Sequence, residues 1–143
     1  MTIAKILLVD DEKPFVEAMG KRLKKRDLKL VTAFNGKEAL ARLAEVGDIE
    51  VVILDIKMPV MDGMETLKKI KDKHPLVEVI MLTGHATVET GIEGMKKGAF
   101  DYLMKPCDAN QLIEKLTEAA ARKRKQEEKI MEARVKAITL RRA

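Results

Sequence analysis

Five short apolar runs, rich in isoleucine, valine and leucine, recur along the first 107 residues and decide the fold of this chain. They are KILLV at 5–9, LKLVTA at 28–33, VVIL at 51–54, VIML at 79–82 and YLM at 102–104. Stretches with helical periodicity separate them, which predicts alternating strands and helices. Runs that are apolar throughout are typical of strands covered on both faces. We therefore predict an α/β fold with a five-stranded parallel sheet between two layers of helices.

Helix-start residues support the intervening helices. Pro14 suits a first turn, and the pairs Asn35 with Glu38 and Asp108 with Gln111 have the spacing of N-terminal caps. Apolar residues at helical spacing mark the faces expected to point inward, namely Phe15, Met19, Leu23, Ala39, Leu40, Leu43, Met64, Leu67 and Ile70. We expect the methionines in or beside these elements to fill gaps in the core, namely Met61, Met64, Met81, Met95 and Met104.

The net charge of +5 comes from the end of the chain. Residues 121–143 hold 9 Lys+Arg against 3 Asp+Glu, whereas residues 1–120 hold 19 against 20. A body with no charge excess and 3% aromatic residues lacks the phosphate contacts and stacking surfaces of a nucleic-acid platform. We therefore expect a globular domain over 1–120, a basic amphipathic helical extension or linker over 121–143, and no direct DNA binding.

Membrane and export signals are not expected in this sequence. Apolar runs stay well below the roughly 20 residues that a spanning helix needs, and the N-terminal apolar stretch is followed too quickly by acids for a signal peptide. Cys107 is the only cysteine, so no internal disulfide can form. That agrees with a reducing compartment, and we expect a cytoplasmic protein with no membrane partner.

Polar residues stand directly after four of the five predicted strands. Asp10 and Asp11 follow the first, Asp55 the third, Thr83 the fourth and Lys105 the fifth. In an open doubly wound sheet, ligands bind beyond the carboxyl ends of the strands, where the strand order reverses. Right-handed crossovers and the order 2-1-3-4-5 place the first and third strands side by side. The three aspartates are then expected to meet.

Three carboxylates at one point need a cation, because each pair at ~4 Å costs roughly 4 kcal/mol at an effective dielectric near 20. Oxygen ligands beside a phosphate favour Mg²⁺, while Lys105 and Thr83 suit the oxygens of a phosphoryl group in transfer. Asp55 ends the central strand before a turn and is the best candidate for the carboxylate that accepts this group. The alternative, that the aspartates only cap helices, explains one of them better than the whole set.

These residues fall within the motifs of a known family. The segments ILLVDDE, VVILDIKMPVMDG, VIMLTGHA and GAFDYLMKP, spread over residues 3–120, resemble a chemotaxis-type (CheY-like) receiver of bacterial response regulators. The resemblance implies a flavodoxin-like fold and a switch in two-component phosphorelay signalling, phosphorylated by a sensor histidine kinase or a phosphotransfer protein. The stretch TGHATVETGIEGMKKGAFDYLMKP most resembles receivers that precede sigma-factor-dependent AAA+ activators. Those receivers commonly have Phe where this chain has Cys107.

The resemblance also implies the metal and phosphate ligands. Asp55 is the phosphoacceptor, and Asp10 and Asp11 hold Mg²⁺ together with Asp55 and the main-chain carbonyl of Lys57. Lys105 pairs with the phosphate. The protein would assist its own phosphorylation and dephosphorylation only, and would not be an enzyme acting on other molecules.

The remaining implied roles concern switching. Thr83 is the switch hydroxyl, Tyr102 is an aromatic rotor, and Lys57 and His85 occupy positions that tune the lifetime of the phosphate. Pro106 fits a cis-peptide position. We expect Thr83 to move toward the phosphate, Tyr102 to turn into the vacated space, and the face of the fourth helix, fifth strand and fifth helix (the 4-5-5 face) to change. An ordinary core position is the alternative for Tyr102.

Two rival functions use the same sheet. An enzyme that hydrolyses small phosphate esters through an aspartyl phosphate would have its nucleophile in an early D-x-D motif and a substrate cap, whereas Asp10 and Asp11 are adjacent and no insertion is long enough for a cap. A flavin-binding electron carrier would need aromatic residues to stack on the flavin ring, and its phosphate would be repelled by the acids.

Residues 109–140 contain no Pro or Gly and could form one helix of ~48 Å. Its apolar set, Ile130, Ala133, Ala137 and Leu140, needs a partner. Three readings stay open: a coiled-coil dimer arm or signalling linker, a helix that docks on a separate effector, and a solvated extension. We expect the RKRK cluster at 122–125 to be a solvated face. A homodimer through the 4-5-5 face and this helix follows from the first reading, and the downstream effector is not identified.

Overall fold

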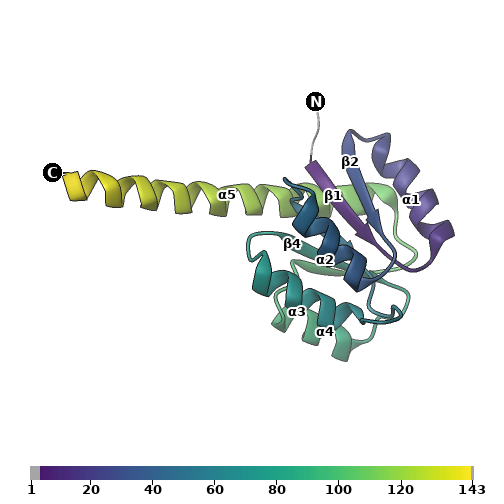
Figure 1. Ribbon diagram of the computed structural model, residues 1–143. Helices are drawn as coiled ribbons and strands as arrows, with labels where there is room; N and C mark the ends of the chain where they lie inside the picture. The colour runs from purple at the N-terminus through teal and green to yellow at the C-terminus, as the bar shows by residue number, and fades with distance from the viewer. Residues whose placement is uncertain (1–3, 143) are drawn as a thin grey trace.

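A computed structural model of the chain describes residues 4–142, in which five strands alternate with five helices (Figure 1). The strands are β1 (Ala4–Val9), β2 (Leu28–Ala33), β3 (Val51–Leu54), β4 (Glu78–Thr83) and β5 (Asp101–Met104). The helices are α1 (Lys13–Lys24), α2 (Gly36–Glu45), α3 (Gly63–Lys73), α4 (Val88–Lys96) and α5 (Ala109–Arg142). Each predicted strand is therefore confirmed to within one residue at either end.

All strands are parallel, and their order is β2-β1-β3-β4-β5, as predicted. The reversal of strand order lies between β1 and β3. There Val9 pairs with Leu54, so the two chains leave the sheet at the same level. The amide of Asp55 still donates to the carbonyl of Val9 at 3.2 Å. The residues that follow these two strands are thereby brought together.

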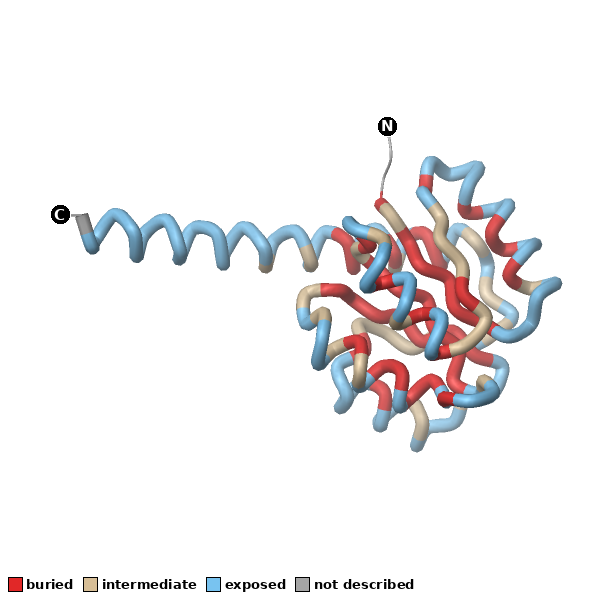
Figure 2. Tube along the Cα trace, in the orientation of Figure 1, coloured by how far each residue is buried: buried red, intermediate tan, exposed pale blue. Residues whose placement is uncertain are grey.

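The sheet lies between two apolar layers, with α1 and α5 on one face and α2, α3 and α4 on the other (Figures 1 and 2). Alternate residues of β1 point into opposite layers: Ile6 and Leu8 pack toward α1 and α5, and Leu7 and Val9 toward α2 and α3. All four are at most 1% exposed. Fully burying such a side chain contributes roughly 1.5–3 kcal/mol, which explains why the strands read as continuous apolar runs.

Side-chain caps fix the helix starts close to the predicted positions. Asn35 accepts a hydrogen bond from the amide of Glu38 at 2.8 Å, but the Glu38 carboxylate binds the amide of Phe34, one residue earlier than a capping box requires. Pro14 lies in the first turn of α1, as predicted. Asp108 accepts from the amide of Asn110 at 3.2 Å, just before α5.

Two of the predicted core methionines are not in the core. Met61, Met64 and Met81 are buried, whereas Met95 and Met104 are 49% and 62% exposed. The prediction was wrong for these two because β5 is the edge strand of the sheet and α4, which packs beside it, leaves one side uncovered. Their exposure adds apolar surface to the 4-5-5 face.

The last helix, α5, has 34 residues and is about 51 Å long. Its first part packs under the sheet as far as Ala120, and the rest projects from the domain (Figures 1 and 2). The unbroken helix expected over 109–140 is thus confirmed. Among residues 4–142, no helix is long and apolar enough to span a membrane.

Acidic residues at the amino ends of β3 and β4 bind α5 where it leaves the domain. Arg124 makes two hydrogen bonds to Glu50, at 2.7 and 2.6 Å. Arg122 lies 3.8 Å from Glu78, and its guanidinium lies over the ring of Phe100 at 5.7 Å. Both arginine side chains are still more than half exposed, so they belong to the predicted solvated face and also contact the domain.

Candidate functional site

Three aspartates meet beyond the carboxyl ends of β1 and β3, as the sequence predicted. One carboxylate oxygen from each of Asp10, Asp11 and Asp55 lies within 4.8 Å of the other two. Asp10 and Asp55 are only 1% and 3% exposed, whereas Asp11 is exposed. The cluster therefore has two buried carboxylates and one that faces solvent.

The loop after β3 holds Asp55 through its backbone. Asp55 Oδ1 accepts from the amide of Ile56 at 2.7 Å, and the amide of Gly63 donates to the Ile56 carbonyl at 2.6 Å. A Cβ atom at Gly63 would stand 2.0 Å from the carbonyl oxygen of Asp55, so no larger residue fits this crossing. The glycine that opens α3 thus lets the loop fold tightly around the aspartate.

Lys105, from the loop after β5, places its ammonium among these acids. Nζ lies 2.6 Å from Asp10 Oδ2, 3.3 Å from Glu12 Oε1 and 3.8 Å from Asp55 Oδ2. The same nitrogen lies over the Phe15 ring, 4.1 Å from its centroid. This is close enough for a cation–π contact.

Sequence reasoning missed both Glu12 and Phe15 as neighbours of Lys105. Glu12 directly follows the aspartate pair, and this adjacency was the available signal. Phe15 was assigned only to the inward stripe of α1, where it is half-buried. Helical spacing gives the side of a helix that faces the core, but it does not show that the ring also lies against the ammonium of Lys105, from the loop after β5.

Burial and charge crowding shift the pKa values of this cluster. Burial raises the pKa of Asp10 above its ordinary value and the nearby Asp55 charge adds to the rise, although Lys105 and the amide of Glu12 oppose it. Burial alone would lower the pKa of Lys105, but its hydrogen bond to Asp10 and the charges of Asp10 and Asp55 raise it. Lys105 is therefore a fixed positive charge at neutral pH.

The predicted switch residues lie on β4 and β5. Thr83 is fully buried, and its hydroxyl oxygen accepts from the amide of His85 at 3.1 Å. Tyr102 is half-buried, and its hydroxyl lies 2.5 Å from the hydroxyl of Thr90 on α4. Sequence reasoning gave Thr90 no role.

The residues expected to tune the lifetime of the phosphate lie at the rim. Lys57 and His85 are both exposed. Lys57 lines a hollow together with Asp11, Met58, Pro59 and Asp62. The peptide bond between Lys105 and Pro106 is cis, as expected.

Fold and site together define a doubly wound α/β domain with an acidic, lysine-paired site where its strand order reverses. A sequence model of the response regulator receiver domain matches residues 6–117. The chain belongs to this family of phospho-accepting switches in two-component signalling.

Curated relatives include the transcriptional regulatory protein ZraR of Klebsiella oxytoca, 38% identical over 89% of this chain and 28% of that protein. The DNA-binding transcriptional regulator NtrC of Salmonella typhimurium is 37% identical over 76% of this chain and 23% of its own length. This chain therefore spans less than a third of either relative. The predicted resemblance to receivers of transcriptional activators agrees with both.

Solved structures give the same family. The receiver domain of the Francisella response regulator 1452 is 31% identical with a TM-score of 0.77, over 83% of this chain and 98% of that one. NtrX from Brucella abortus is 32% identical with a TM-score of 0.82, over 90% of this chain and 29% of that one. The flavodoxin-like, CheY-like fold class is thereby confirmed.

Proposed function

We propose that this receiver accepts its phosphoryl group on Asp55, from a sensor histidine kinase or a phosphotransfer protein. The observation that carries the proposal is the position of Asp55: it is buried, within 4.8 Å of Asp10 and Asp11 in the oxygen cluster, and 3.8 Å from Lys105. Asp55 directly follows β3, the central strand, which lies between β1 and β4. A phosphoryl group on Asp55 would therefore lie between the acidic cluster and the ammonium.

The same residues fit Mg²⁺. Their donor atoms are all oxygens, and burial, together with the nearby Asp55 charge, raises the pKa of Asp10, so a divalent ion would offset charge that is costly to bury. Asp10, Asp11, Asp55 and the main-chain carbonyl of Lys57 would hold the ion. Bound there, it would neutralise charge on the phosphoryl oxygens during transfer.

The proposed transfer is a displacement at phosphorus. A carboxylate oxygen of Asp55 forms a bond to phosphorus, while the phosphorus–nitrogen bond of the donor's phosphohistidine breaks and the imidazole takes up a proton from water. Lys105 keeps its proton and offsets charge on the transferred oxygens. Water later attacks the same phosphorus, the bond from phosphorus to the Asp55 oxygen breaks, and inorganic phosphate leaves, which restores the carboxylate and makes the switch reversible.

The proposed switch uses Thr83 and Tyr102. Lys105 and Thr83 would donate to the new phosphoryl oxygens, and charge-assisted hydrogen bonds contribute roughly 1.5–3 kcal/mol each. Moving a two-state equilibrium from 1:99 to 99:1 takes about 5.5 kcal/mol, so two such contacts nearly suffice. Movement of Thr83 toward the phosphate would vacate space for Tyr102 and change the 4-5-5 face.

Intact-mass analysis after incubation with acetyl phosphate and Mg²⁺ tests the proposal. We expect one added phosphoryl mass that is lost on alkaline hydrolysis, and none in Asp55→Asn or with EDTA. A gain that persists in Asp55→Asn would refute Asp55 as the acceptor. A colorimetric phosphatase assay on the same protein should show no sustained turnover, as expected of a switch that acts only on itself.

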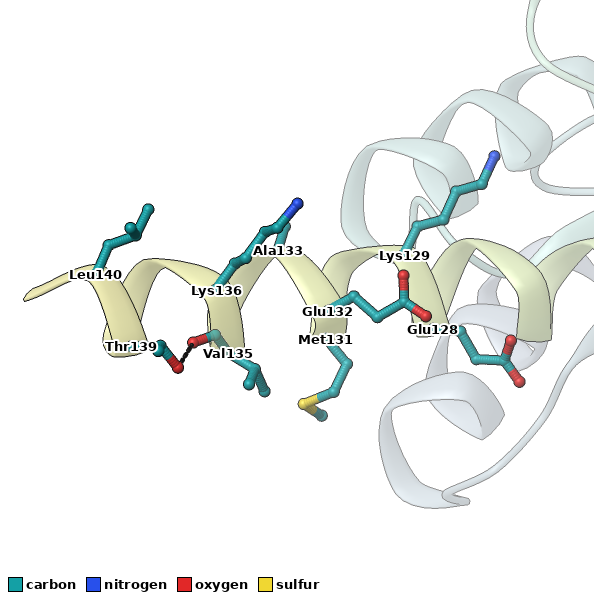
Figure 3. A pocket seen from close by; sticks show the side chains of 9 residues that line it. All are labelled: Glu128, Lys129, Met131, Glu132, Ala133, Val135, Lys136, Thr139 and Leu140. Atoms are coloured by element: carbon teal, nitrogen blue, oxygen red, sulfur yellow. Dashed lines mark hydrogen bonds between the residues drawn. The ribbon is translucent and has the colours of Figure 1, made fainter. Parts of the chain in front are cut away.

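We also propose a homodimer through the 4-5-5 face and α5. The α4 residues Val88, Ile92 and Met95 and the β5 residue Met104 are exposed apolar side chains of these elements, each 49–80% exposed. Along the projecting part of α5, Met131 and Val135 are exposed and project from the same side of the helix (Figure 3). Both sets of exposed apolar side chains belong to the elements α4, β5 and α5 of the proposed interface.

Light scattering before and after phosphorylation tests the dimer. We expect the dimer fraction to rise with phosphate, Ile92→Glu to abolish that rise, and Val135→Glu to weaken association in both states. Monomers under all conditions would refute this part of the proposal. The division into a receiver over 1–120 and a linker over 121–143, the cytoplasmic location and the absence of direct DNA binding stay predictions.

A further inference from the structure

Tyr102 rests on α4. Its hydroxyl lies 2.5 Å from Thr90 Oγ1, and its ring packs against the helix at Gly91 and Gly94. A Cβ atom added to either glycine would stand 3.7 Å from the ring, in ordinary van der Waals contact, so the ring lies directly over this part of the helix. The proposed switch aromatic therefore has a defined seat, made by residues of one helical turn.

The Thr90 hydroxyl has a second set of partners at the start of α4. It accepts from the amide of Thr87 at 3.0 Å and donates toward the Thr87 carbonyl at 3.1 Å, and the Thr87 hydroxyl caps the amide of Thr90 in return. Thr87 is the N-cap of α4. One hydroxyl group thus joins the N-terminus of the helix to the switch aromatic.

Helix α4 is weak in itself, which makes this connection important. It has nine residues, and Gly91 and Gly94 are the least favourable residue type for a helix interior after proline. Its only buried residue is Gly94. Contacts from outside the helix, including the Tyr102 ring and hydroxyl, must therefore contribute to its position.

We propose that Thr90 is a positioning residue that holds Tyr102 on α4 in the unphosphorylated protein and so opposes activation. Leaving the seat breaks the Tyr102–Thr90 hydrogen bond and frees the hydroxyl that caps α4, so the movement of Tyr102 and the change in α4 become one event. The proposal rests on the switch proposed above for Thr83 and Tyr102. It adds Thr90, Gly91 and Gly94 to that switch.

The composition of the chain gives a direct test. Tyr102 is the only tyrosine and tryptophan is absent, so 3-fluorotyrosine incorporated into the full chain gives a fluorine NMR signal from this residue alone. Beryllofluoride with Mg²⁺ serves as the phosphoryl mimic. In the wild type we expect the signal to shift on titration, and in Thr90→Val to lie nearer the activated position before any addition.

The midpoint of the titration measures how strongly the Tyr102–Thr90 hydrogen bond opposes activation. Thr90→Val should lower the beryllofluoride concentration at the midpoint by about tenfold, which corresponds to about 1.4 kcal/mol. Thr90→Ser, which keeps the hydroxyl, should behave as the wild type. A Thr90→Val signal and midpoint equal to those of the wild type would overturn the proposal.

A double-mutant cycle separates the two roles of Thr90, its hydrogen bond to Tyr102 and its capping of α4. The midpoint is then followed at the backbone amide of Thr83, because Tyr102→Phe removes the fluorotyrosine. Tyr102→Phe alone should lower the midpoint, and adding Thr90→Val should lower it no further, since both remove the same bond. An equal effect of Thr90→Val in both backgrounds would assign it to the cap and overturn the proposal. If the wild type responded to neither beryllofluoride nor acetyl phosphate, the proposed function itself would fail.

Discussion

The ammonium nitrogen of Lys105 lies 2.6 Å from Asp10 Oδ2 but 3.8 Å from Asp55 Oδ2. In the unphosphorylated protein the lysine is therefore paired mainly with a proposed metal ligand and only loosely with the proposed acceptor. A cation held by the three aspartates would compete with the ammonium for the carboxylate of Asp10. Arrival of a phosphoryl group on Asp55 would give Lys105 a new anionic partner and release Asp10.

Replacing Lys105 with methionine tests this competition. The change leaves Asp10 and Asp55 without their cation, and loss of one partner of a buried pair costs about 3 kcal/mol. We expect a lower free energy of unfolding in EDTA and tighter Mg²⁺ binding than in the wild type, measured by urea unfolding with and without the ion. Weaker Mg²⁺ binding in Lys105→Met would show that the lysine supports the metal site and does not compete with it.

The raised pKa of Asp10 predicts how stability depends on pH without metal. The folded state keeps the Asp10 proton to higher pH than the unfolded chain, whose pKa is near 3.8. Stability from this group is therefore full below that value and falls as pH rises through the folded pKa. In EDTA, Asp10→Asn should gain stability over the wild type as pH rises through this window. A gain that does not change with pH would contradict the prediction.

Mg²⁺ binding should show the opposite trend with pH. Protons and the metal ion compete for the Asp10 carboxylate, so the affinity for Mg²⁺ should rise as pH rises through the same window. Isothermal titration at several pH values measures it, together with the number of protons released. An affinity that is constant across the window would mean that Asp10 is already ionised there or does not hold the ion.

Gly63→Ala should be among the most damaging small substitutions in this chain. The new methyl group would stand 2.0 Å from the Asp55 carbonyl oxygen and 2.6 Å from Ile56 Cα, both backbone atoms that cannot rotate away. We expect a loss of about 3 kcal/mol in the free energy of unfolding, at the upper end of overpacking effects, and slower phosphorylation. Gly47→Ala is the matched control, because nothing lies within 4 Å of its added atom.

Glu50→Gln is expected to loosen α5 where it leaves the domain without unfolding the protein. The Glu50–Arg124 pair is partly solvent-exposed, so its loss should cost about 1 kcal/mol or less. Amide hydrogen exchange around residues 121–126 should become faster, while exchange in β3 stays unchanged. Glu127→Gln, which removes the pair that Glu127 forms with Lys123 within α5 itself, should have a smaller effect and is the control. Equal exchange in both variants would argue against anchoring by Glu50.

The sheet and the aspartate cluster could be predicted because the sequence signals for them lie within single strands and directly after them. Each buried strand is a continuous apolar run, and strand order alone brings Asp10 and Asp55 together. The contacts that were missed join elements far apart in sequence, such as Phe15 with Lys105 and Arg124 with Glu50. Periodicity shows which side of a helix faces inward, but not which side chain of a distant element it meets.

The unbroken course of α5 has a geometric consequence for anything joined to its far end. A helix advances about 1.5 Å and turns about 100° for every residue, so adding one residue beyond Arg124 would rotate an attached group to a different side of the domain. Adding seven would move it outward by about 10.5 Å yet return it to within about 20° of its former heading. The length of this helix therefore sets the direction in which an attached group faces. Insertions into the helix should be tolerated when they match its period, and not simply when they are short.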